Sequence, residues 1–233
     1  MNPLISCIVP VFNGERYLDE ALDSIFAQTY RPLEVIVVDD GSTDTTAEVT
    51  TRYGDHITYI WQANAGPSAA RNRGVETASG AFIAFLDADD IWHKEKLACQ
   101  MTRFETRPEL EICLSYAQNL WIPDLKQEEE RFSDSDLAIA KPHLPSGGVV
   151  KRALWERVGP FNTSLKHRDA MDWLARAREA GAVMETVPDV LVFRRIHQDN
   201  LSRRRRQSDD ADELVRSVKT ILDLRRRKSD ENA

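Results

Sequence analysis

Short apolar segments alternate with amphipathic segments through about the first hundred residues, and this alternation limits the choice of fold more than any other feature of the chain. The run Val35-Ile-Val-Val38 is apolar at every position, as in a strand that is covered on both faces of a sheet. We expect strands at residues 5–10, 33–39, 57–61 and 81–86, and helices at residues 17–28, 45–53, 68–77 and 93–107. The alternation predicts an α/β fold with a mainly parallel, Rossmann-like central sheet flanked by helices.

The second half of the chain is less regular. Residues 123–145 are polar, acidic and weakly periodic, which indicates a loop or lid. Around them we expect strands at residues 112–117, 183–187 and 190–196, and helices at residues 152–158, 169–180 and 208–227. The simplest organisation is one domain over residues 1–200, whose second half completes the site, followed by a basic C-terminal helix over residues 201–233.

Composition describes an ordinary globular protein. The 233 residues are 42% hydrophobic and 30% charged, and no run approaches the roughly 18 apolar residues that a membrane span needs. The N-terminus lacks the pattern of a signal peptide, and the three cysteines have no paired spacing. We therefore expect a cytoplasmic protein with reduced thiols.

The C-terminal tail carries most of the basic charge. Residues 194–233 contain twelve Arg and Lys against eight Asp and Glu, a net charge of +4 within a chain of −7. Such a tail can make peripheral contact with an anionic membrane at its inner face or with phosphorylated substrates; the alternative is a solvated helix face with interleaved acids. Nucleic-acid binding is not expected, because no known nucleic-acid-binding motif accompanies the arginines.

The segment Phe82-Ile-Ala-Phe-Leu-Asp-Ala-Asp-Asp90 is an apolar strand that ends in three carboxylates. Asp87 and Asp89 leave the same face of this strand, because side chains alternate along it. Their like charges repel, and a hard divalent cation relieves the repulsion while leaving coordination positions for substrate phosphates. The segment is therefore interpreted as a metal-bridged diphosphate site, or else as a solvated loop tip or helix N-cap.

Further polar residues follow the neighbouring strands, at the sheet edge where ligands of open α/β proteins bind. Pro10, Phe12 and Asn13 end the first strand, and Asp40 ends the second. Phe12 offers a flat face to a nucleobase or packs in the core, and Asp40 accepts a hydrogen bond from a base or serves the turn. Arg71, at a helix entry, can reach a base or phosphate. The chain has no G-x-G-x-x-G fingerprint and no P-loop, which argues against Rossmann dehydrogenases and P-loop NTPases.

These segments together resemble a known family. In order, they are Ser6-Cys-Ile-Val-Pro-Val-Phe-Asn-Gly14, Val38-Asp-Asp-Gly-Ser-Thr-Asp44, Gly66-Pro-Ser-Ala-Ala-Arg-Asn-Arg-Gly74 and Phe85-Leu-Asp-Ala-Asp-Asp-Ile-Trp92. They are similar to the corresponding segments of family 2 inverting glycosyltransferases, which have the GT-A fold. The resemblance covers residues 4–107 strongly and residues 147–200 more loosely.

The resemblance implies a nucleotide-binding half at about residues 1–110 and an acceptor half at about residues 111–200. It implies a nucleotide-sugar donor, with UDP favoured, and a saccharide or lipid-linked acceptor in cell-surface polysaccharide or glycoconjugate synthesis. Asp87 would lie between the ribose and a Mg²⁺ or Mn²⁺ ion, and Asp89 would bind the ion most directly. The residues implied near the donor nucleotide are Pro10, Phe12, Asn13, Asp40 and Arg71.

The resemblance also implies a catalytic base in an acidic pair at the start of the helix that follows the lid. Here Ala170 stands where relatives often have the second acid of the pair. This departure leaves Asp169 as the first candidate for the base and Asp172, one turn later, as the second. The alternative is a structural role for both acids, because negative charge in the first turn of a helix interacts favourably with the helix dipole. His197 is a candidate for the metal or diphosphate, or a structural histidine.

Two other functions fit the same residues. A non-catalytic nucleotide-sugar-binding protein is suggested by Ala170, and a nucleotidyltransferase also uses carboxylates and a metal on an α/β sheet. Binding without transfer would identify the first, and pyrophosphate release from a nucleoside triphosphate would identify the second.

Overall fold

The computed structural model describes residues 1–125, 139–140, 144–165 and 168–200. The first half contains β1 (Ile5–Val11), α1 (Leu18–Phe26), β2 (Leu33–Asp39), α2 (Thr46–Thr51), η1 (Gly54–His56), β3 (Thr58–Trp61), α3 (Pro67–Thr77), β4 (Phe82–Phe85), β5 (Ile91–Trp92) and α4 (Lys96–Thr106). The second half contains β6 (Ile112–Trp121), η2 (Pro123–Leu125), β7 (Ile139–Ala140), α6 (Leu144–Gly147), β8 (Gly148–Lys151), α7 (Arg152–Val158), α8 (Asp169–Glu179) and β9 (Met184–Ile196).

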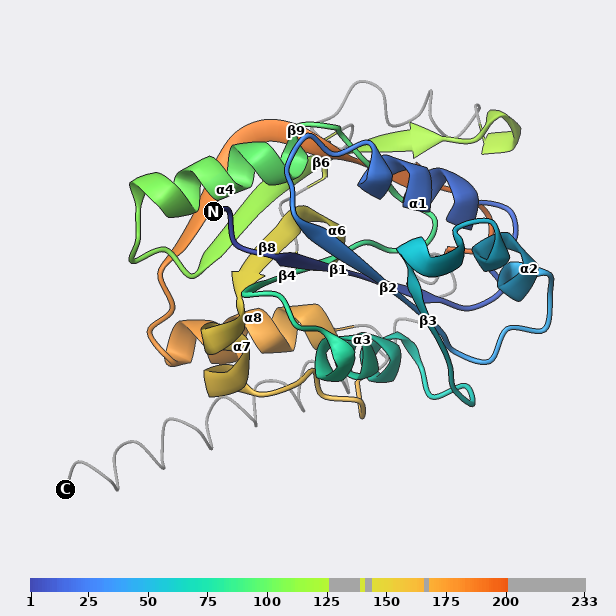
Figure 1. The fold of residues 1–233 in the computed structure, drawn as a ribbon, viewed down its shortest axis with the longest axis horizontal. Helices are drawn as coiled ribbons and strands as arrows, with labels where there is room; N and C mark the ends of the chain where they lie inside the picture. Colours follow the sequence, from blue (N-terminus) through green and yellow to red (C-terminus); the bar gives the residue numbers. More distant parts are fainter. Residues whose placement is uncertain (126–138, 141–143, 166–167, 201–233) are drawn as a thin grey trace.

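Within the described ranges, nine strands join one curled sheet with helices on both faces (Figure 1). The strand order is β3-β2-β1-β4-β8-β6-β9-β5, and β7 pairs with β6. Helices α1, α2 and α4 cover one face, and α3, α7 and α8 cover the other (Figure 1). The α/β prediction is therefore confirmed.

The parallel part of the sheet comes from the first half of the chain. β1 lies between β2 and β4 and is parallel to both, and β3 extends this arrangement beyond β2. Every residue of β1 is buried, because helices cover both of its faces. The predicted alternation of strand and helix is confirmed here, with ends that differ by at most three residues.

Helix α3 packs very close to β1 because Gly74 faces the strand. A Cβ atom at Gly74 would lie 2.3 Å from Ile8 Cγ2, so a larger residue would force the helix away from the sheet. The close approach brings the N-terminal turn of α3, with Ser68 and Arg71, to the carboxyl ends of the strands.

The second half of the sheet mixes antiparallel and parallel pairs, which the sequence pattern did not indicate. β8 is antiparallel to both of its neighbours, β4 and β6, whereas β6 and β9 are parallel. Residues 183–187 and 190–196, predicted as two strands, form the single strand β9. Pro188 and Asp189, which separated the two predicted strands, lie where the register of β9 against β6 shifts, so a bulge accommodates them.

Two predicted segments fall wholly or partly outside the described residues. The predicted loop or lid at 123–145 includes η2, β7 and the start of α6, and its residues 126–138 and 141–143 are not described. The predicted basic helix over residues 201–233 is also outside. In the described part of the chain, no helix combines the length and apolar character needed to cross a membrane.

The core consists of two clusters of buried apolar side chains, one on each face of the sheet. Leu22 and Met101 belong to the cluster beneath α1 and α4, and Trp155 and Trp173 belong to the cluster beneath α7 and α8. Lys96, the first residue of α4, is fully buried beside the first cluster. Burial lowers the pKa of its amine from 10.5 to about 7.

This buried amine predicts a pH dependence of stability. Above about pH 7 the native amine is neutral, whereas the unfolded chain keeps the proton up to about pH 10.5. The unfolded state therefore binds more protons, and the free energy of unfolding should rise by up to about 1.4 kcal/mol per pH unit from pH 7 to pH 8.5. Lys96→Met should lack this increment in urea unfolding measured at pH 6.5, 7.5 and 8.5. Parallel pH curves for the two proteins would contradict the assignment.

Candidate active site

The carboxyl ends of β1, β2 and β4 meet at one edge of the sheet. Val11 pairs with Asp39, and Ile8 pairs with both Ile36 and Phe85, so the loops that follow these strands emerge side by side. This arrangement brings together the segments that the sequence analysis placed at a common ligand site.

The loops after β1 and β2 are tied to each other by hydrogen bonds. Asn13 has a φ of 51°, and its Oδ1 accepts a hydrogen bond from the N–H of Thr43 at 2.8 Å. The N–H of Asn13 donates to Ser42 Oγ at 2.9 Å. Pro10 is buried within β1, whereas Phe12, the next residue but one, is 53% exposed. Phe12 therefore presents an apolar ring to solvent at the strand ends instead of packing in the core.

Asp40 is buried, and its carboxylate fixes the loop after β3. Asp40 Oδ1 accepts hydrogen bonds from Gln62 Nε2 at 2.7 Å and from the N–H of Ala65 at 2.9 Å. Oδ2 accepts from the N–H of Gly66 at 2.8 Å. A carboxylate has about four acceptor positions, so these bonds leave room on Oδ2 for a ligand N–H. The predicted contact between Asp40 and a nucleobase stays a prediction.

Arg71 lies between two carboxylates that come from different parts of the chain. Its Nη2 donates to Asp87 Oδ1 at 2.7 Å, and its Nη1 donates to Asp169 Oδ2 at 2.9 Å. The side chain is 7% exposed. Burial opposes the charge, but the two carboxylates outweigh this effect and raise the pKa of Arg71. The arginine thus joins residues 87–90, the acid segment after β4, to the first turn of α8.

The two acids at the start of α8 have different surroundings. Asp169 accepts hydrogen bonds from Ser68 Oγ at 2.8 Å and from Arg71, both on Oδ2. Asp172 is fully buried and pairs with Arg176 at 2.9 Å. Ala170, which stands where relatives often have the second acid of the pair, packs against the core.

The acid segment after β4 contains two partly exposed carboxylates and one buried carboxylate. The side chains of Asp87 and Asp89 are each 31% exposed, whereas Asp90 is buried. Burial raises the pKa of Asp90 well above its usual value, and the charges of Asp89 and Asp87 raise it further. Asp90 accepts a hydrogen bond from Ser146 Oγ at 2.6 Å.

The segment that ends β9 holds the acid segment from the other side. His197 Nε2 lies 2.9 Å from Asp89 Oδ2, and Asn200 Nδ2 donates to the same oxygen at 2.9 Å. Arg195 donates to the backbone oxygen of Asp89 at 3.1 Å, and its N–H donates to Asp90 Oδ1 at 3.1 Å. His197, predicted at the metal or diphosphate, is in this geometry a partner of the predicted metal ligand Asp89.

The residues of the acid segment fit a divalent cation of the Mg²⁺ or Mn²⁺ type. No group of three or more His, Cys, Asp or Glu side chains converges on a metal position within the described part of the chain. Such ions need fewer protein ligands, because one or two carboxylates suffice when water and substrate phosphates complete the coordination. Asp87 and Asp89 provide this donor set with solvent access.

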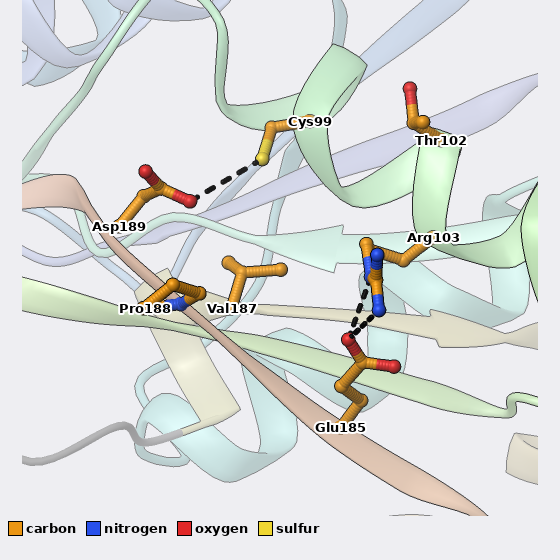
Figure 2. A pocket seen from close by; sticks show the side chains of 7 residues that line it. All are labelled: Cys99, Thr102, Arg103, Glu185, Val187, Pro188 and Asp189. Carbon is orange, nitrogen blue, oxygen red and sulfur yellow. Dashed lines mark hydrogen bonds and ion pairs between the residues drawn. The ribbon is translucent and has the colours of Figure 1, made fainter.

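A separate pocket of 380 Å³ lies between α4 and β9 (Figure 2). In it Cys99 Sγ lies 3.9 Å from Asp189 Oδ2, and Arg103 pairs with Glu185. None of the predicted site residues lines this pocket. The residue chemistry therefore places the candidate site at the strand ends and not in this pocket.

Four residues of the site were not indicated by the sequence analysis: Ser68, Ser146, Arg195 and Asn200. Ser68 lies in the same motif as Arg71, and Arg195 and Asn200 lie in the same segment as His197, so motif membership was an available signal. Ser146 has no comparable local signal, because its contacts depend on how the chain returns to β4.

The sequence model of glycosyl transferase family 2 matches residues 6–146. The chain belongs to this family. It is 30% identical over 208 residues to an uncharacterized glycosyltransferase of Rickettsia prowazekii, covering 84% of this chain and 65% of the relative. An uncharacterized glycosyltransferase of Escherichia coli K12 is 43% identical over 158 residues, covering 66% of this chain and 43% of the relative. The chain thus spans less than two thirds of either relative's length.

Solved glycosyltransferase structures share the fold. TarS 1-349 of S. aureus in complex with UDP has a TM-score of 0.69 at 21% identity, covering 82% of this chain and 60% of that chain. The mannosyltransferase PcManGT of Pyrobaculum calidifontis, in complex with GDP-Man and Mn²⁺, has a TM-score of 0.70 at 22% identity, covering 95% of this chain and 65% of that chain. The GT-A fold prediction is confirmed.

The buried arginine of this family 2 member gives a stability prediction. Arg71→Met removes the cation between two carboxylates and should lower the free energy of unfolding by about 3–5 kcal/mol. Arg73→Met, on the same helix, removes an exposed pair with Glu76 and should cost less than about 1 kcal/mol. Urea unfolding of both variants measures the difference, and equal losses would show that Arg71 is not a buried bridge.

Proposed function

We propose that the protein is a metal-dependent inverting glycosyltransferase, hexosyltransferase-like, which moves a sugar from a nucleotide-diphosphate donor, with a UDP-sugar favoured. The supporting observation is the bridge made by Arg71, which holds Asp87, the predicted donor-side acid, close to Asp169, the predicted base. Sugar transfer needs one carboxylate on the donor side and another that removes the proton of the acceptor hydroxyl. Arg71 holds two carboxylates, Asp87 and Asp169, close enough together for these two roles.

The donor nucleotide is proposed to bind over the loops after β1 and β2. The exposed ring of Phe12 offers a surface for base stacking, and Asp40 keeps acceptor capacity for a base N–H. Asn13 holds these loops together, and Pro10 anchors them in β1. Arg71 is near enough to Asp87 to influence the donor through that carboxylate.

Asp89 and Asp87 are the residues that would hold Mg²⁺ or Mn²⁺, with Asp89 as the more direct ligand. The bound ion supplies positive charge that offsets the negative charge on the departing diphosphate. Asp89 is oriented for this task by His197 and Asn200. Nε2 of His197 is bonded to Asp89, so direct binding of the metal or diphosphate through this atom would require that bond to break.

Asp169 is proposed as the base that removes the proton of the acceptor hydroxyl. In the described part of the chain, its hydrogen bonds fall on Oδ2, which leaves Oδ1 for the acceptor. Attack on the anomeric carbon from the face opposite the leaving group then inverts its configuration. Asp172 is the weaker candidate, because it is fully buried against Arg176.

The acceptor is proposed to be a saccharide or a lipid-linked saccharide, as in the synthesis of cell-surface polysaccharides or glycoconjugates. Membrane contact through the basic segment over residues 201–233 remains a prediction, since these residues are outside the described ranges. The acceptor half at about residues 111–200 provides Asp169, which makes this half the place to look for acceptor contacts.

The donor and cation assignments can be tested by thermal shift. UDP with Mn²⁺, and a panel of UDP- and GDP-sugars, should raise the melting temperature of the wild-type protein, because a ligand that binds only the native state stabilises it. Asp89→Asn should lose the metal-dependent part of the shift, while Asp55→Asn, an exposed acid on η1, should retain it. Retention of the full shift by Asp89→Asn would remove Asp89 from the site.

The base assignment can be tested by comparing two variants of α8. Asp169→Asn should reduce transfer by about 100-fold or more while donor affinity in calorimetry stays close to wild type. Asp172→Asn should lower stability but leave the turnover of the folded fraction within a few-fold. The opposite pattern would make Asp172 the base.

The same assays separate the two other functions. Donor binding without hydrolysis or transfer across a broad acceptor panel would identify a non-catalytic binding protein. Release of pyrophosphate from a nucleoside triphosphate would identify a nucleotidyltransferase.

A further inference from the structure

Lys96 is a fully buried amine without a carboxylate partner among the described residues. Its Nζ donates to Gln100 Oε1 at 2.9 Å and lies 4.3 Å from the centroid of the Trp92 ring. Exposed lysines are easily hydrated, and a fully buried one is retained only at an energetic cost. The hydrophobic core alone therefore does not account for a lysine at this position.

The two partners of Lys96 both bind the backbone of α6. Gln100 Nε2 donates to the backbone oxygen of Gly147 at 2.9 Å and to that of Cys113 at 2.8 Å. Trp92 Nε1 donates to the backbone oxygen of Ser146 at 2.8 Å. Gln100, Ser146 and Gly147 are buried, and so is Trp92, so water does not compete for these hydrogen bonds.

Ser146 in turn contacts the acid segment. Its Oγ accepts a hydrogen bond from the N–H of Asp87 at 3.2 Å and donates to Asp90 Oδ2 at 2.6 Å. One hydroxyl thus fixes the first and last residues of the acid segment. Trp92, which follows the segment, is also held from α1, because its N–H donates to Ser24 Oγ at 3.1 Å.

We propose that Lys96, Trp92 and Gln100 are positioning residues that brace the Ser146–Gly147 backbone and, through Ser146, hold the acid segment in the geometry that binds the donor and its cation. This role deepens the proposed function and rests on it. Lys96 orients both partners at once: its ammonium or amine faces the Trp92 ring and fixes the Gln100 amide so that Nε2 points to Gly147. None of the three touches the donor; they act through Ser146.

A purely structural role makes a different prediction from a positioning role. A core residue lowers the melting temperature when it is replaced, but the folded fraction keeps its affinity and local protection. A positioning residue changes the acid segment within the folded protein. Residues that hydrogen-bond metal ligands typically alter affinity by about 10–100-fold, and residues that act through Ser146 are expected near the lower end of this range.

The test compares Lys96→Met with Lys94→Met, an exposed lysine two positions earlier. Hydrogen exchange of the protein without ligand should become at least about tenfold faster at residues 87–90 in Lys96→Met and stay unchanged in Lys94→Met. Calorimetry with UDP and MnCl₂ should show affinity reduced by at least about tenfold for Lys96→Met and within twofold of wild type for Lys94→Met.

Trp92→Phe provides a second variant should Lys96→Met fail to fold. It keeps an aromatic ring beneath the amine and removes the N–H donated to Ser146. Trp92→Phe should show part of the faster exchange and part of the lower affinity. The double variant Ser146→Ala/Trp92→Phe should differ little from Ser146→Ala alone, because both substitutions interrupt the same connection through Ser146.

The outcomes separate this inference from the proposed function. Unchanged exchange at residues 87–90 and unchanged UDP affinity in folded Lys96→Met or Trp92→Phe would overturn the positioning role. If the wild-type protein does not bind UDP with Mn²⁺, the proposed donor site is wrong. The exchange measurement would still show whether Lys96, Trp92 and Gln100 hold the acid segment in place.

Discussion

The structure depends on balancing a concentration of negative charge at the ends of its parallel strands. Parallel pairing of β1, β2 and β4 brings acids to one edge of the sheet, and the acid segment after β4 adds a buried carboxylate at Asp90. Carboxylates so close together are stable only when cations or hydrogen-bond donors surround them. Arg71 supplies the most direct compensation, because its buried guanidinium contacts both Asp87 and Asp169.

The rest of the chain contributes donors to the same cluster from distant positions. The end of β9 contributes His197 and Asn200 to Asp89, and α6 contributes Ser146 to Asp90. The same two parts of the chain also share one continuous sheet, because β6, β8 and β9 extend the sheet that β1 to β4 begin. The second half of the chain thus supplies hydrogen bonds to the acid segment and also carries Asp169, the proposed base.

The sequence pattern predicted the first half of the fold well, because the strands and helices there are determined by residues close together in the sequence. Alternating apolar runs and helical periodicity identify β1 to β4 and the helices between them. The need for glycine at position 74 is explained only by the structure, where α3 packs closely against Ile8. The pattern predicted two strands with a break at Pro188, where β9 in fact continues through a bulge, and it did not indicate the two-residue strand β5. Short or irregular strands form because a neighbouring strand accepts their hydrogen bonds, and that neighbour is not encoded nearby.

By itself, the sequence determined the family, the α/β alternation and the identity of the acids at the strand ends. It also made Asp169 the first candidate for the base despite Ala170. Only the tertiary structure decided which hydrogen-bond donor contacts which acid. Ser68 and Arg71 contact Asp169 across about a hundred residues of sequence, and Asn200 contacts Asp89 across a similar separation. The reason is physical, since strand and helix periodicity depend on neighbouring residues, whereas the pairing of buried charges depends on how the two halves of the sheet pack together.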